Sequence, residues 1–196
     1  MSAPDLNTLS PDNIVPFIAD IFARRGAEEY IGEPVTISEH MLQAAEFAEQ
    51  SGASEDVVAA ALLHDIGHFT SEFPANAADD NVDNIHEEAG ARILQQFFPP
   101  LVHDCVRYHV AAKRYLCATD PDYFAKLSEA SVHSLNLQGG PMSEAEIAEF
   151  RSNPHLDAIV QVRIWDDMGK DPNHAAPAFA HYQPLLERVV QAHAAA

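Results

Sequence analysis

Basic residues are scarce in this sequence: 11 Lys and Arg stand against 30 Asp and Glu in 196 residues, so the formal net charge is −19. A chain of that charge repels phosphate-rich partners, which excludes a non-specific nucleic-acid binder and a protein that docks on anionic membranes. No apolar run approaches the roughly 18 residues that a membrane span needs. The first residues also lack the basic and apolar segments of a secretory signal.

Cysteine is also scarce, with only Cys105 and Cys117 in the sequence. These two do not form a Cys-x-x-Cys pair. Two cysteines are too few for a disulfide framework, so we expect a soluble, reduced, cytoplasmic protein. The length predicts a single domain over residues 1–196, with a flexible N-terminal segment over residues 1–9. No protein partner is indicated.

Apolar residues, by contrast, are plentiful at 47%, and they recur with a helical period along the chain. No stretch alternates as a strand for long, so the pattern predicts an all-α bundle of about eight or nine helices. These helices are expected to begin near residues 11, 38, 55, 86, 101, 121, 144, 154 and 178, at proline and capping signals such as the Ser143–Glu146 box. The longest irregular segments, 28–37, 70–85 and 138–143, are long enough to be functional loops.

Histidine is the unusual component, with 11 copies. His64 and Asp65 stand at the end of an apolar helix, where adjacent side chains point about 100° apart. Both can serve one metal centre if the carboxylate spans two metals while the imidazole binds one. Candidates of the same kind stand on other predicted helices: His40, His86, His109 and Asp166. Four imidazoles and two carboxylates suit iron, manganese or zinc, although any one histidine alone is more often a solvated or hydrogen-bonded residue.

The order of these residues is that of the HD-domain superfamily in its two-metal version. From about residue 30 to residue 170, the sequence resembles the HD-domain mixed-valence diiron oxygenases that act on organophosphonates. The segments that carry the resemblance are AALLHDIGH (60–68), HEEAGA (86–91), HVAAKRYL (109–116), LSEAS (127–131) and QGGPM (138–142). HVAAKRYL and QGGPM are far more specific than the His-Asp pair, and neither is expected in a generic HD hydrolase.

The resemblance implies a single HD-domain bundle around a dinuclear site, with two iron ions, Fe(II) and Fe(III), as cofactor and O₂ as cosubstrate. One iron would be held by His40, His64, Asp65 and Asp166, and the other by Asp65, His86 and His109. Family members also carry a tyrosine and a glutamate ahead of the first histidine, which match Tyr30 and Glu33. In the family, that tyrosine caps the substrate-side iron and leaves when substrate arrives.

An acidic chain that binds a phosphonate needs a local cationic site. Lys113 lies four residues after His109 and Arg163 lies three before Asp166, so helical spacing puts each basic residue on the face of a proposed ligand. His68 stands in the same relation to His64, and Ser131 in LSEAS matches a family phosphonate contact. The expected substrate contacts are Tyr30, Glu33, His68, Lys113, Ser131 and Arg163, of which Tyr30, Glu33 and His68 are expected to be catalytic.

The predicted substrate is a small zwitterionic phosphonate. Aromatic and acidic residues flanking the site suit a quaternary ammonium, and equally a primary amine: Tyr30, Glu33, Phe69, Phe73, Asp79, Asp80 and Asp83. We expect O₂-dependent cleavage of the phosphorus–carbon bond of (1R)-1-hydroxy-2-(trimethylammonio)ethylphosphonate to glycine betaine and phosphate. The alternatives are the same reaction on 2-amino-1-hydroxyethylphosphonate, a metal-dependent phosphohydrolase with a bridging water, and an HD module that binds a ligand without turnover.

Overall fold

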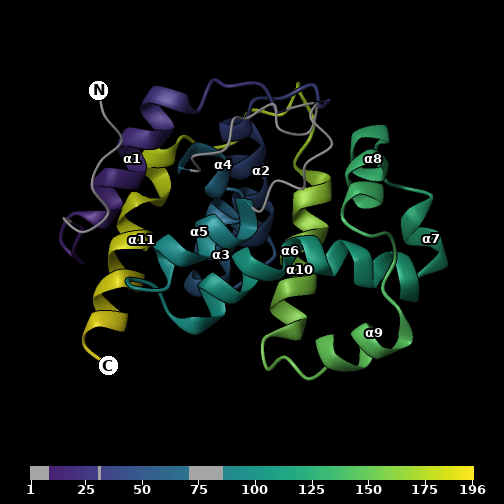
Figure 1. The fold of residues 1–196 in the computed structure, drawn as a ribbon. Coiled ribbons are helices and arrows are strands. Elements are labelled where there is room, and N and C mark those ends of the chain that lie inside the picture. The colour runs from purple at the N-terminus through teal and green to yellow at the C-terminus, as the bar shows by residue number, and fades with distance from the viewer. Residues whose placement is uncertain (1–8, 31, 71–85) are drawn as a thin grey trace.

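The computed structural model describes residues 9–30, 32–70 and 86–196, and this part of the chain is all-α, as predicted. Figure 1 shows a central group of helices with α1 and α11 on one side and α7, α8 and α9 on the other. The described helices are α1 (Ile14–Arg25), α2 (Ile37–Gln50), α3 (Glu55–Leu63), α4 (Gly67–Thr70), α5 (His86–Leu94), α6 (Pro100–Thr119), α7 (Pro121–Phe124), α8 (Glu129–Leu137), α9 (Glu144–Phe150), α10 (Leu156–Met168) and α11 (Phe179–Ala194). An isolated bridge joins Glu29 and Thr36.

The helix boundaries follow local capping chemistry. Reciprocal capping boxes start α2 at Thr36 and Glu39, and α9 at Ser143 and Glu146. Two short helices were not predicted, α4 and α8, so the described residues hold eleven helices rather than eight or nine. Helix α6 continues to Thr119, because no glycine or proline interrupts it before residue 121.

Helix α3 is the centre of the core. Its residues from Val58 to Leu63 are all almost fully buried, and it packs against α2, α6, α10 and α11. A helix that is apolar on every side must be covered on every side. As a result, α3 delivers the residues directly after it, His64 and Asp65, into the interior of the protein.

Two predictions fall on residues that the structure does not describe. The expected flexible N-terminal segment lies outside the described residues except for Leu9, and so does the loop 71–85 with Phe73, Asp79, Asp80 and Asp83. Within the described ranges, no helix combines the length and the apolar character needed to cross a bilayer.

Candidate metal centre and substrate pocket

The six predicted ligands converge in the structure from separate parts of the fold. They come from the beginnings, ends and middles of helices that lie far apart in the sequence, and each is at most 7% exposed: His40 of α2, His64 and Asp65 after α3, His86 of α5, His109 of α6 and Asp166 of α10.

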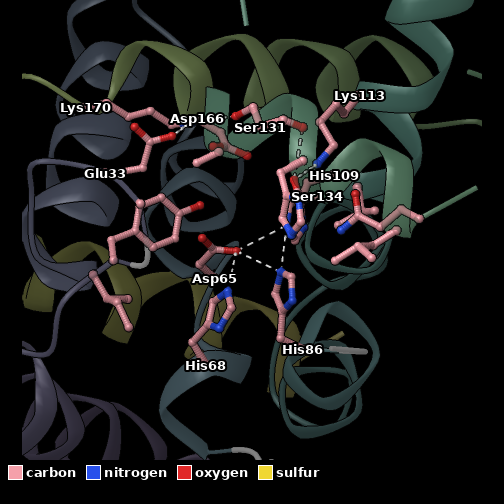
Figure 2. Close-up of a pocket in the computed structure, with 18 of the residues that line it drawn as sticks. Glu33, Asp65, His68, His86, His109, Lys113, Ser131, Ser134, Asp166 and Lys170 are labelled. Carbon is pink, nitrogen blue, oxygen red and sulfur yellow. Dashed lines mark hydrogen bonds and ion pairs between the residues drawn. The ribbon is translucent and has the colours of Figure 1, made fainter. Parts of the chain in front are cut away.

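Asp65 lies between two groups of histidines. Its Oδ2 atom is 3.5 Å from His40 Nε2 and 3.6 Å from His64 Nε2. Its Oδ1 atom is 3.1 Å from His86 Nε2 and 3.2 Å from His109 Nε2, and the dashed lines in Figure 2 mark these last two contacts. Each oxygen of one carboxylate therefore faces its own pair of imidazoles, as a carboxylate shared by two cations requires.

The centre holds buried polar atoms that the protein itself leaves unsatisfied. Both carboxylate oxygens of Asp65 and the Oδ1 atom of Asp166 are buried without a hydrogen-bond partner, which is costly unless a cation compensates them. Burial by itself would raise the pKa of Asp65, but the surrounding histidines together outweigh burial and hold that pKa well below its usual range. A mixed set of ionised carboxylates and imidazoles fits a transition-metal cofactor.

The other nitrogen of three imidazoles is held by the backbone. In each of these rings Nδ1–H donates to a carbonyl oxygen, which fixes the tautomer and leaves the Nε2 lone pair facing the centre. The Nδ1-to-oxygen distances are 2.9 Å for His40 and Gly169, 2.8 Å for His64 and Ala61, and 2.7 Å for His109 and Val106. At position 169 a Cβ atom would lie 2.8 Å from the His40 carbonyl oxygen, so glycine permits this approach of α10 to α2.

A cavity of about 390 Å³ opens over Asp65, Asp166 and the histidine pair His86 and His109. Every residue predicted to contact substrate lines it: Tyr30, Glu33, His68, Lys113, Ser131 and Arg163. The cavity also has lining residues that the sequence analysis did not select, among them His133, Ser134 and Lys170.

Two lysines reach the cavity wall formed by α8. Lys113 is 3% exposed, and its Nζ atom donates to Ser134 Oγ over 2.8 Å. Lys170 Nζ donates to Ser131 Oγ over 2.9 Å, and Figure 2 shows the two lysines on opposite sides of Ser131. The sequence analysis did not select Lys170, and helical spacing from Asp166 could not have placed it, because α10 ends at Met168.

Arg163 has carboxylate partners inside the protein. Its Nη1 atom is 2.6 Å from Asp166 Oδ2, its Nη2 atom pairs with Asp167, and its Nε atom donates to Tyr123 Oη over 3.1 Å. Helical spacing correctly placed Arg163 beside Asp166 and also allows the pair with Asp167, four residues further on. Nothing in the spacing indicated Tyr123. Arg163 therefore contacts both the cavity and Asp166, one of the six predicted metal ligands.

Tyr30 and His68 stack on the histidine groups. The Tyr30 ring lies 4.3 Å from the His40 ring at an interplanar angle of 16°, and burial followed by the charge of Asp65 raises the pKa of Tyr30 well above its usual value. The His68 ring lies 3.9 Å from that of His86 at 18°. Burial and then the neighbouring His86 lower the pKa of His68 to about 3, so His68 is a neutral donor rather than a cation.

Comparison with known proteins agrees with this geometry. The HD domain family matches residues 37–143. A 1-hydroxy-2-(trimethylamino)ethylphosphonate dioxygenase (glycine-betaine-forming) of Leisingera caerulea is 58% identical over 98% of this chain and 98% of its own. A hydroxymethylphosphonate dioxygenase of Gimesia maris is 40% identical over 97% and 96%. An uncharacterized protein of Acanthamoeba polyphaga mimivirus is 33% identical over 86% and 78%.

Proposed function

Because the chain belongs to the HD domain family, together with phosphonate dioxygenases that match it along nearly its whole length, we propose that it uses O₂ to cleave the phosphorus–carbon bond of 1-hydroxy-2-(trimethylammonio)ethylphosphonate. The products are glycine betaine and phosphate. The observation that carries this proposal is the 58% identity to the glycine-betaine-forming relative across 98% of both chains. The reaction balances, since each product contains one oxygen atom more than the fragment from which it comes.

The proposed cofactor is a pair of iron ions. One would be held by His40, His64, Asp65 and Asp166, and the other by Asp65, His86 and His109. When bound, iron supplies the one-electron chemistry with O₂ that breaking this bond requires. The protein holds three of these imidazoles, those of His40, His64 and His109, in one tautomer through backbone carbonyls. The pKa values of Asp65 and Asp166 lie well below their usual range, which keeps both carboxylates ionised.

The chain's other residues bind and orient the substrate. Lys113, Ser131 and Lys170 surround the phosphonate with charge-assisted donors, and His68 donates as a neutral ring. Glu33 is the carboxylate available to the ammonium group. Tyr30, stacked on His40 at the cavity wall, occupies the space beside the metal centre until substrate enters.

The function is tested by reconstituting the protein with ferrous iron without air and then measuring O₂ uptake, phosphate and glycine betaine. We expect O₂ uptake and equal amounts of both products with the trimethylammonio substrate. The same assay is run with 2-amino-1-hydroxyethylphosphonate and with hydroxymethylphosphonate, the compound named in the second relative. Faster turnover of either one would replace the proposed substrate, and phosphate release without O₂ uptake would indicate a hydrolase.

Phosphonate binding is expected to weaken above about pH 8. Burial, followed by the charge of Arg163, lowers the pKa of Lys113 to about 8, so the amine is charged below that pH and neutral above it. The phosphonate itself can only gain negative charge as the pH rises. The dissociation constant of methylphosphonate, measured by calorimetry from pH 7 to pH 9.5, should therefore rise by up to about tenfold per unit once Lys113 has titrated.

Two variants check the origin of this pH dependence. Lys113→Arg keeps its charge throughout the range and should abolish the rise, whereas Lys126→Arg, at an exposed lysine, should leave it unchanged. An affinity that is independent of pH in the parent protein would mean that Lys113 does not bind the phosphonate.

A further inference from the structure

Lys170 contacts residues at both ends of the proposed substrate site: Ser131 at the phosphonate end and Glu33 at the ammonium end. Its Nζ atom lies 3.0 Å from Glu33 Oε1 and donates to Ser131 Oγ over 2.9 Å. The side chains of Lys170 and Glu33 are only 12% and 7% exposed, so this ion pair is better shielded from solvent than a surface pair. In Figure 2, Lys170 and Glu33 lie together at one side of the cavity, next to Ser131.

Glu33 belongs to the same turn as Tyr30. The backbone N–H of Glu33 donates to the Tyr30 carbonyl oxygen over 2.9 Å, and Glu33 Oε1 also accepts from Ser128 Oγ over 2.6 Å. Gly32, between them, has a φ of +79°, and a Cβ atom there would lie 2.9 Å from the Ala130 Cβ atom. The turn therefore rests directly on α8, and the bonds from Ser128 and Lys170 to Glu33 hold it there.

Lys170 also has two more distant neighbours. Asp167 Oδ1 is 4.0 Å from its Nζ atom, and the centroid of the Tyr30 ring is 6.0 Å away. A phosphonate dianion at Ser131 carries more charge than the Glu33 carboxylate, and it also repels that carboxylate. The arriving anion and Glu33 must therefore compete for the same ammonium group.

We propose that Lys170 is a positioning residue that exchanges Glu33 for the phosphonate, and that this exchange releases the turn carrying Tyr30. The inference rests on the proposed function, since it takes the anion to be the phosphonate of the substrate. Once released, Glu33 is free to face the ammonium group at the other end of the substrate. Anion binding and the departure of Tyr30 thus become one coupled event.

If Glu33 and the anion compete for Lys170, removing the Glu33 charge should tighten anion binding, whereas loss of a simple contact would weaken it. Methylphosphonate, which has no ammonium group, is titrated into the iron-loaded protein under nitrogen. Glu33→Gln removes the competitor and should tighten methylphosphonate binding about fivefold, whereas Lys170→Met should weaken it about 10- to 100-fold. In the double variant Lys170→Met, Glu33→Gln, the gain from the glutamine should disappear, because the ammonium group that it would free is absent.

Matched controls separate this coupling from general effects of charge and folding. Glu149→Gln makes the same charge change at an exposed side chain outside the cavity lining, and Lys126→Met does so for an exposed lysine; each should alter the affinity less than about twofold. With the full substrate, Lys170→Met should raise KM, and Lys170→Arg should restore most of the loss because it keeps the charge. Iron content and thermal unfolding are measured for every variant.

The proposal is overturned if Glu33→Gln binds methylphosphonate no more tightly than the parent. It is also overturned if the gain in affinity persists in the variant that lacks Lys170, or if the parent protein does not bind methylphosphonate. These outcomes are distinct from failure of the proposed function, which is read as absent O₂ uptake. A protein that takes up O₂ with the substrate but shows no gain in Glu33→Gln retains the function and loses the coupling.

Discussion

Asp65→Ala should abolish binding of both proposed iron ions, not one. The two carboxylate oxygens of Asp65 face different histidine pairs, at 3.5–3.6 Å on one side and 3.1–3.2 Å on the other. Removal of the shared carboxylate leaves one position with His40, His64 and Asp166 and the other with His86 and His109 alone. Loss of a residue that only orients a ligand typically costs 10- to 100-fold in metal affinity, so loss of a direct ligand shared by both positions should cost at least that much. Iron per chain, measured by mass spectrometry after reconstitution and desalting, should fall from about two to near zero.

The matched control is Asp20→Ala, which removes an exposed carboxylate paired only with Arg24 on the same helix and should keep the parent iron content. Asp65→Asn is informative as well, because it preserves the shape of the side chain but loses the charge. Retention of one iron ion in Asp65→Ala would show that the carboxylate serves a single metal and that the two histidine groups are independent.

Arg163→Ala should destabilise the fold rather than simply weaken substrate binding. Arg163 is buried and pairs with both Asp166 and Asp167, so its removal leaves the buried Asp166 carboxylate without its guanidinium partner. Breaking a buried ion pair from one side costs about 3–5 kcal/mol. The free energy of unfolding of the metal-free protein in urea should fall by that amount.

Lys113→Ala provides the contrast, because the amine of Lys113 bonds to a neutral hydroxyl, Ser134 Oγ, and not to a buried carboxylate. That variant should keep its iron and its resistance to urea while losing about 10- to 150-fold in phosphonate affinity. Arg163→Lys, which keeps the charge but loses the planar fork, should fall between the parent and the alanine variant. Equal stability of Arg163→Ala and the parent would mean that Arg163 binds substrate and does not support Asp166.

The contrast between Arg163 and Lys113 marks a limit of helical spacing. Spacing correctly placed each residue on the same face as a metal ligand, because i, i+3 and i, i+4 neighbours on a helix lie together whatever surrounds the helix. It could not distinguish a residue held by carboxylates from one facing a cavity. That distinction depends on Tyr123, 40 residues away from Arg163 in the sequence, and on Ser134 of α8, a helix that the periodicity did not predict.

The sequence by itself determined the all-α class, most helix starts and the ordered set of histidines and aspartates, because helical period, capping chemistry and residue type are local properties. The tertiary structure decided what each side chain faces. It placed the two oxygens of Asp65 toward separate histidine pairs, gave Lys170 both Glu33 and Ser131 as partners, and brought Tyr123 to Arg163. These relations join segments that are distant in the sequence, so they depend on how the helices pack around α3 and not on any pattern within one segment.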